Sequence, residues 1–285
     1  TPSRASYCQR PGPALTGFAT RMNSPLPIHL ILLPGLDGTG ELFAPLLRRI
    51  ERMHIHADEP QLIAHALRYP THDKLDLRQL HHAVEHYIAH NLPEDARYVI
   101  LGESFSGPVA ITVAYAAQTA REGEALSRRR CMGLILCCSM ARNPYVMFAP
   151  LAPLWSVLPI ELVPMGWVNR LAQGKLDFWA GGQELAMNKV DTQVLRHRLQ
   201  IISKVDVTAE LSALRMPVLY LQATKDVVVP ASCARLVQDC APQTMLARID
   251  SSHFLLQSKP GKALAQIQSF IAQMVVDGFS SLHFS

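Results

Sequence analysis

The stretch VILGESFSGPVAIT, residues 99–112, decides the fold and raises the main functional question. It begins as a short apolar run typical of a buried strand and continues as a segment typical of a helix. Ser104 stands at the junction. The surrounding residues approach the pattern G-x-S-x-G, but Ser106 replaces the last glycine. Ser104 is therefore either a nucleophile on a sharp turn or an ordinary helix cap.

The same alternation of strand and helix recurs along most of the chain. Short apolar runs typical of strands occur at residues 28–34, 61–67, 98–102, 132–139, 217–223 and 244–250. Helical patterns follow at residues 41–53, 75–91, 105–118, 231–239 and 262–276. This order predicts an α/β fold with a mostly parallel, doubly wound sheet that helices cover on both faces.

Residues 141–210 interrupt the alternation, because they are rich in Pro, Trp, Met and Leu and contain no predicted strand. Repeated prolines in this segment exclude a membrane-spanning helix. We predict one helical insertion, a lid, after the fourth strand. The remaining organisation is predicted as a flexible tail at 1–25, a core at 26–140 and 211–277, and a C-terminal tail at 278–285.

The composition narrows the class of protein. The chain has 285 residues, 49% of them hydrophobic, and a net charge of +4 with few clustered basic residues, which gives little support for nucleic-acid binding. Its six cysteines form no C-x-x-C pair and no metal-ligand spacing. The N-terminus lacks the apolar segment of a signal peptide. These features predict a cytoplasmic protein without stable membrane insertion.

Reactive residue types follow several of the predicted strands. Ser104, Asp226 and His253 each come just after a strand, and the loop LPGLDGTG, residues 33–40, follows the first one. Carboxyl ends of parallel strands meet at one edge of a sheet, so these groups are expected to lie close together. A hydroxyl, an imidazole and a carboxylate are the groups of a nucleophile, its base and an orienting acid.

In this order and placement, the segments resemble the α/β-hydrolase superfamily, in particular its lidded serine esterases and lipases. The resemblance covers roughly residues 26–277 and is carried by LLPGLDGTG, GESFSG, QATKDVVVP and DSSHFLLQ. It implies that Ser104 is the nucleophile, that His253 is its base and that Asp226 orients the imidazole.

The resemblance also implies where an oxyanion and a substrate would lie. The backbone N–H groups of Leu36 and Phe105 would form the oxyanion hole. Substrate contacts are expected from Gly35 and Asp37 and from the lid tryptophans Trp155, Trp167 and Trp179. An apolar lid favours an apolar acyl or alcohol group, although the same tryptophans would also fill the lid's own core.

These inferences predict a serine hydrolase that cleaves a carboxylic ester through an acyl-serine intermediate, with no cofactor and no metal. A thioesterase, a pimeloyl-type acyl-carrier-protein methyl ester esterase and an acyltransferase remain open. A ligand-binding receptor that retains the triad is the alternative from another class. The predicted lid holds seven Lys and Arg against six Asp and Glu, a balance that leaves an acyl carrier protein as an open partner.

Two residues at the turn, Ser106 and Glu103, depart from the usual pattern. Ser106 stands where glycine is usual because a tight turn leaves little room, and we expect it to fit with some strain. As a nucleophile it would place Pro108 where a small residue is needed, whereas Pro108 suits a first helical turn. Glu103 would either raise the pKa of His253 or form a surface salt bridge.

Two further sequence patterns give only weak support for a metal site or a dinucleotide-binding loop. His82, His86 and His90 recur every four residues, but they project opposite the apolar stripe of their helix. We therefore expect them to be exposed rather than to bind a metal. The glycines of GLDGTG, residues 35–40, do not have the spacing of a dinucleotide-binding loop.

Overall fold

The computed structural model describes residues 26–53, 60–124, 126–144, 186 and 188–281. Most of the predicted lid lies outside these ranges. Trp155, Trp167 and Trp179, which were predicted to contact substrate, therefore lie outside the described residues.

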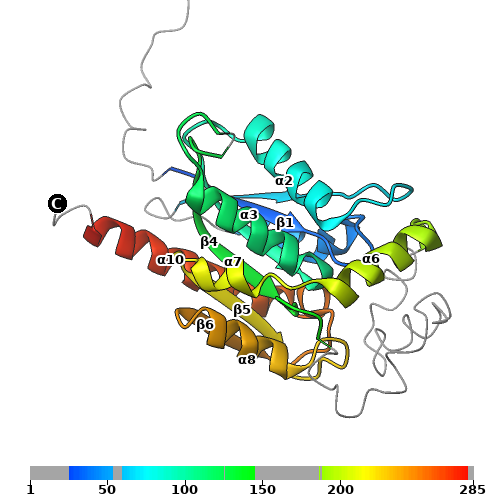
Figure 1. Cartoon of the computed structure of the whole chain (residues 1–285). Helices are drawn as coiled ribbons and strands as arrows, with labels where there is room; N and C mark the ends of the chain where they lie inside the picture. The colour runs from blue at the N-terminus through cyan, green and yellow to red at the C-terminus, as the bar shows by residue number, and fades with distance from the viewer. Residues whose placement is uncertain (1–25, 54–59, 125, 145–185, 187, 282–285) are drawn as a thin grey trace, which may run out of the picture.

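The described residues form a six-stranded sheet in the order β2-β1-β3-β4-β5-β6 (Figure 1). Its strands are β1 (Ile28–Leu33), β2 (Leu62–Ala66), β3 (Arg97–Glu103), β4 (Arg130–Cys137), β5 (Val218–Ala223) and β6 (Thr244–Ile249). Every neighbouring pair is parallel. The predicted α/β class is confirmed, with a sheet that is parallel throughout.

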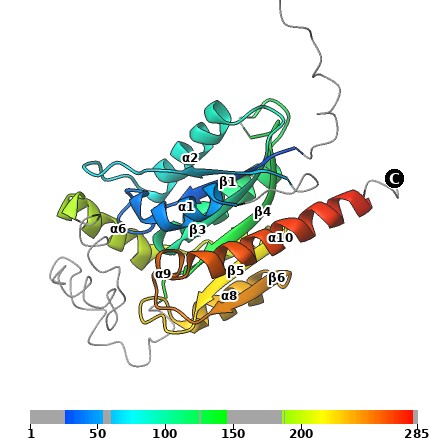
Figure 2. The ribbon, with the colours of Figure 1, turned by 180° about the vertical axis from the view of Figure 1, so that it is seen from behind.

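Helices cover both faces of the sheet. One face carries α1 (Ala44–Glu51), α9 (Leu255–Ser258) and α10 (Pro260–Ser281), seen in front in Figure 2. The other carries α2 (Leu77–Asn91), α3 (Gly107–Thr119), α7 (Thr208–Ala213) and α8 (Ala231–Cys240). The short 3-10 turns η1 (Glu41–Phe43) and η2 (Ser104–Ser106) precede α1 and α3.

Burial on both faces explains why the strands appear as continuous apolar runs. All six residues of β1 are buried. Ile31 and Leu33 pack toward α2 and α3, whereas Leu30 and Leu32 pack toward α1 and α10. The sheet therefore separates two apolar layers and holds its strand ends in fixed register.

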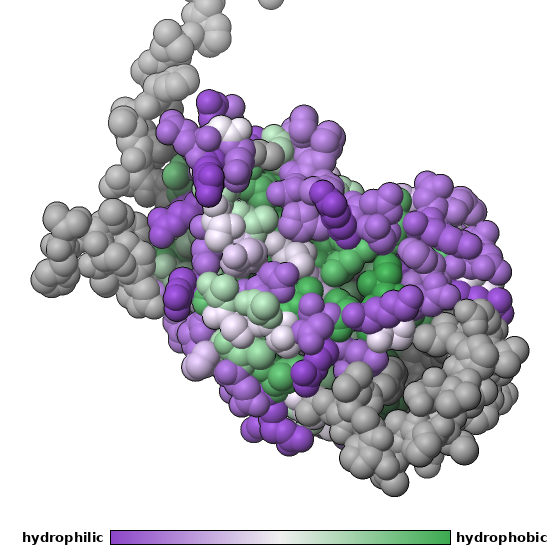
Figure 3. Space-filling view, in the orientation of Figure 1, coloured by the Kyte–Doolittle hydropathy of each residue, from purple (hydrophilic) through white to green (hydrophobic). Residues whose placement is uncertain are grey.

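Helix α2 shows how local sequence sets an element's start and its buried side. Asp76 caps it, since Oδ1 accepts a hydrogen bond from the Gln79 N–H at 2.8 Å and the Gln79 side chain accepts from the Asp76 N–H at 2.9 Å. Leu80, Val84 and Ile88 are buried. In Figure 3 hydrophilic side chains predominate over α2, and apolar ones show near the centre of the same face.

The three histidines of the predicted pattern, His82, His86 and His90, are exposed on α2, which confirms that expectation. No helix in the described ranges has the length and apolar character needed to cross a bilayer.

The two ends of the 141–210 segment meet. An antiparallel bridge joins Arg142 and Asp206, and the Val207 N–H donates to Ala141 O at 2.9 Å. The chain thus leaves the core and returns at one place, which is the geometry of an insertion. Helix α6 (Thr192–Lys204) lies in its last part, and Leu211 of α7 belongs to the core beside α3.

Gly107 tests how closely α3 approaches the end of β4. A Cβ at this position would lie 1.8 Å from Ser139 Oγ and 2.8 Å from Ser139 Cβ, so Gly107→Ala is expected to lower the free energy of unfolding by about 1–3 kcal/mol. A Cβ at Gly261, at the start of α10, would meet only Arg49 Cζ, at 4.0 Å, so Gly261→Ala should be neutral or stabilising by up to about 1 kcal/mol. Urea unfolding of both variants measures the difference, and equal effects would contradict the close approach.

Candidate active site

Ser104 occupies a sharp turn between β3 and α3. Its φ is 50°, in the left-handed region, which only Cys138 shares among the described non-glycine residues. A conformation of this kind costs about 1–3 kcal/mol and persists only where neighbouring contacts impose it. The Ser104 side chain makes no helix-capping hydrogen bond, so the interpretation as an ordinary cap is wrong.

Two glycines make this turn sterically feasible. A Cβ at Gly102 would lie 2.7 Å from Ser106 O and 2.9 Å from Gly107 Cα. Gly107 itself faces Ser139, whose Oγ donates a hydrogen bond of 2.5 Å to Ser104 O. The G-x-S-x-G pattern has a glycine at its fifth position, where this chain has Ser106. Here the glycine that the close approach requires is the next residue, Gly107.

The turn brings Ser104 to His253 and Asp226. Ser104 Oγ lies 2.9 Å from His253 Nε2, and His253 Nδ1 lies 2.8 Å from Asp226 Oδ2. Because a carboxylate only accepts hydrogen bonds, Nδ1 carries the proton and Nε2 is free to accept from the serine hydroxyl. The side chains of His253 and Asp226 are only 8% and 5% exposed, so water competes little with this chain of hydrogen bonds.

Adjacent strands hold the two groups in place. Asp226 follows β5 and His253 follows β6, and the loops are joined where Thr224 and Lys225 donate backbone hydrogen bonds to Ile249 and Ser251, both at 3.0 Å. The second carboxylate oxygen, Asp226 Oδ1, accepts from the Val228 and Val229 N–H groups at 2.8 and 2.9 Å. Asp226 is thus oriented from both sides.

The loop after β1 lies beside the serine. A Cβ at Gly35 would lie 3.8 Å from Ser104 Cβ, so this backbone passes directly by the nucleophile position. Within the described ranges, no group accepts a hydrogen bond from the Leu36 N–H. Phe105 follows Ser104 and is buried. The structure therefore places the loop that carries Leu36 beside Ser104, and the oxyanion hole of the Leu36 and Phe105 N–H groups stays a prediction.

Asp37 stabilises the same loop. Its Oδ2 accepts from the Thr39 N–H at 2.8 Å and from Thr39 Oγ1 at 2.6 Å, and the side chain is buried. These bonds fold residues 37–39 into a turn in which the side chain replaces a backbone acceptor. A contact between Asp37 or Gly35 and substrate stays a prediction.

Glu103 is buried beside the nucleophile. The Gln257 amide donates to Glu103 Oε1 at 2.9 Å, and burial raises the pKa of Glu103 to about 7. The surface salt bridge expected for this residue is wrong, because the side chain is only 5% exposed.

Ser106 fits the turn without strain of its own. Its φ is −84°, so the expectation of strain at this residue is wrong, and the left-handed conformation falls on Ser104 instead. The Ser106 side chain is fully buried and hydrogen bonds to Tyr69 and to Pro34 O.

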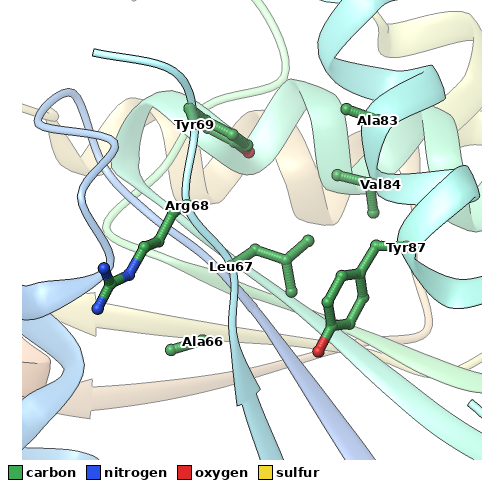
Figure 4. Close-up of a pocket in the computed structure, with 7 residues that line it drawn as sticks. All are labelled: Ala66, Leu67, Arg68, Tyr69, Ala83, Val84 and Tyr87. Carbon is green, nitrogen blue, oxygen red and sulfur yellow. The ribbon is translucent and has the colours of Figure 1, made fainter. Parts of the chain in front are cut away.

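Sequence reasoning did not identify Tyr69, Arg198 or Gln257 as parts of this region. Arg198 carried a detectable signal, because it lies one helical turn after Val194 on the buried side of α6. Tyr69 and Gln257 carried none, since their partners are distant in sequence. Tyr69 also lines a cavity of about 340 Å³ between the end of β2 and α2 (Figure 4), which contains no triad residue.

Two groups within the described chain bring three potential metal ligands within 4.8 Å of one another. His81, His82 and Glu85 form one on the surface of α2. The other consists of Cys138, Asp226 and His253, but there the imidazole and carboxylate are already hydrogen bonded to each other. Neither group changes the expectation of metal-free chemistry.

The chain belongs to the alpha/beta hydrolase family, whose family model matches residues 30–267. No curated protein sequence matches the chain.

Solved structures share its fold. The chain is similar to a lipase-esterase related protein from Clostridium acetobutylicum ATCC 824, with a TM-score of 0.64 and 13% identity over 87% of this chain and 96% of that one. It is similar to the esterase RhEst1 from Rhodococcus sp. ECU1013, with a TM-score of 0.61 and 18% identity over 87% and 91% of the two chains. It is also similar to the enol-lactonase from Burkholderia xenovorans LB400, with a TM-score of 0.59 and 16% identity over 89% of this chain and 93% of that one. At these identities the similarity shows the fold alone.

The buried Glu103 carboxyl predicts a specific dependence of stability on pH. The folded state keeps its proton to a pKa of about 7, whereas an unfolded glutamate releases it at about pH 4.3. The contribution of Glu103 to stability is therefore fully present below about pH 4 and is lost as the pH rises through about 7. Between pH 5 and pH 8 the wild type should lose about 2–3 kcal/mol more than Glu103→Gln.

Urea unfolding at the two pH values measures this difference. Glu51→Gln, at an exposed position of α1, is the matched control and should keep the wild-type dependence. An unchanged dependence in Glu103→Gln would show that the carboxyl ionises normally in the folded state.

Proposed function

We propose that the protein is a serine hydrolase that cleaves a carboxylic ester with an apolar acyl or alcohol part. The observation that carries this proposal is the unbroken chain of hydrogen bonds from Ser104 through His253 to Asp226, at 2.9 and 2.8 Å. Ser104, at the start of this chain of hydrogen bonds, is held in a left-handed turn beside the loop after β1.

The reaction follows from these positions. His253 Nε2 removes the proton of Ser104 as Oγ attacks the ester carbonyl, and Asp226 stabilises the imidazolium that forms. The N–H groups of Leu36 and Phe105 donate to the oxyanion of the tetrahedral intermediate. Its collapse expels the alcohol, which takes the proton from His253, and leaves an acyl group on Ser104 Oγ.

Water then completes the reaction. His253 removes a proton from a water molecule that attacks the acyl-serine carbonyl, and a second tetrahedral intermediate releases the carboxylic acid and restores the Ser104 hydroxyl. No cofactor or metal is needed for either half. A thioester, a carrier-linked acyl ester or an acceptor alcohol in place of water would use the same residues, and the esterase names of the structural relatives favour the simple ester.

Replacement of the nucleophile is the first test. Ser104→Ala removes the attacking oxygen and should lower kcat/KM for p-nitrophenyl esters by about 10⁴-fold or more. A series of increasing acyl length, measured beside wild type, also tests the apolar substrate preference, since turnover should rise beyond acetate. Ser212→Ala, at an exposed position of α7, is the control and should match the wild type.

Two results would redirect the assignment. Equal turnover by wild type and Ser104→Ala would remove the nucleophile from the proposal. Labelling of Ser104 by a fluorophosphonate without turnover of any ester would instead indicate a receptor or a narrow physiological substrate.

Asp226→Asn tests the orienting acid. Two backbone N–H donors fix the side-chain position, so the amide should occupy it with little change in fold. An amide no longer stabilises the imidazolium, and kcat should fall by about 10³- to 10⁴-fold. Burst kinetics with p-nitrophenyl acetate measure this fall in rate. The substitution should slow acylation and deacylation alike. A rate within twofold of wild type would exclude this role.

A further inference from the structure

The hydroxyl of Ser106 links the serine turn to the loop after β1. It hydrogen bonds to Pro34 O, a carbonyl that only accepts, so the single hydrogen of Ser106 is directed there. Tyr69 OH lies 2.8 Å from Ser106 Oγ and must therefore be the donor in that bond. The direction of both bonds is thus fixed, from Tyr69 through Ser106 to Pro34.

Three successive peptide groups of this loop are held by hydrogen bonds. Ser106 holds the carbonyl of Pro34, and the Gly38 N–H holds the carbonyl of Gly35 at 3.1 Å. Arg198 Nη1 holds the carbonyl of Leu36 at 2.7 Å. The middle peptide group joins Gly35 to Leu36. Its N–H, that of Leu36, points in the opposite direction to the Gly35 carbonyl because the peptide bond is trans.

The first and last of these contacts, made by Ser106 and Arg198, come from separate parts of the chain. Arg198 lies on α6 and also donates to Pro70 O at 2.9 Å, while its guanidinium stacks over the Tyr69 ring at 5.8 Å. Tyr69 itself donates its backbone N–H to Gly38 O at 2.7 Å and packs edge-on against Phe105 at 6.4 Å. All of these side chains are buried. Tyr69 therefore contacts both sides of the predicted oxyanion hole.

We propose that Ser106, Tyr69 and Arg198 are positioning residues that fix the Leu36 N–H toward the oxyanion of the transition state. This inference rests on the proposed function. It gives the serine at the usual glycine position a role, since a glycine there would leave Pro34 O and Tyr69 OH without this partner. Preorganised donors stabilise charge that develops during the reaction, so the network acts on the transition state more than on bound substrate.

Ser106→Ala, Tyr69→Phe and Arg198→Lys each remove part of the network. Loss of a whole oxyanion donor lowers kcat by about 10²- to 10³-fold, and a misdirected donor should lower it by about ten- to a hundredfold. KM should stay within about twofold. Affinity for a boronic acid, which forms a tetrahedral adduct on Ser104, should fall in parallel with kcat/KM.

Thr244→Val is the matched control, because it removes a buried hydroxyl that donates to Ala241 O at the opposite end of the sheet. It should keep wild-type kcat and boronate affinity. If Ser106→Ala does not fold, Tyr69→Phe decides, since it leaves the ring in place and removes one oxygen.

The outcomes separate this inference from the proposed function. Wild-type boronate affinity in Tyr69→Phe and Arg198→Lys, with or without a change in rate, would overturn the positioning role while Ser104-dependent turnover stands. A wild type that neither turns over esters nor forms a boronate adduct at Ser104 would overturn the proposed function itself. A fall in kcat without any fall in boronate affinity would assign the effect to general loss of packing.

Discussion

The turn at Ser104 requires a left-handed backbone at a residue with a side chain, and its surroundings supply the contacts that impose it. Gly102 and Gly107 leave room for the close approach of α3 to the ends of β3 and β4. Ser139 holds the Ser104 carbonyl. The result is a hydroxyl that points toward His253 instead of toward the first turn of its own helix. The apolar layers on both faces of the sheet keep these strand ends fixed, so the left-handed conformation of Ser104 persists.

The buried polar groups near this turn are satisfied mainly by backbone groups and neutral partners. Asp226 accepts from two backbone N–H groups, and Gln257 donates to Glu103. Burial raises the pKa of Glu103 to about 7, and the nearby charge of Asp37 acts in the same direction, so a large part of the Glu103 population is protonated and neutral near pH 7. Asp226 is hydrogen bonded to the imidazole of His253, which suits it to stabilise the imidazolium in the proposed mechanism.

The amino-acid sequence was sufficient for the strands and for the meeting of Ser104, Asp226 and His253. Continuous apolar runs identify strands that are buried on both faces, and the carboxyl ends of parallel strands share one edge. It was not sufficient for Glu103, whose partner lies 154 residues away, or for Ser106, whose bond to Tyr69 spans 37 residues. Such pairs depend on how elements pack against one another, which no local pattern records. A single position also suggested strain at Ser106, although the whole turn places it on Ser104.

Arg198 couples the 141–210 insertion to the core. A buried guanidinium is strongly destabilising unless its N–H groups find acceptors, and Arg198 finds them in the carbonyls of Leu36 and Pro70. Burial lowers the pKa of Arg198, and Asp37 acts in the opposite direction, but an arginine stays charged at any physiological pH. A displacement of α6 would leave that charge without its partners and release the Leu36 peptide at the same time. Arg198 therefore links the position of α6 to the loop beside Ser104, so we expect substitutions that loosen the packing of α6 to act on the loop as well.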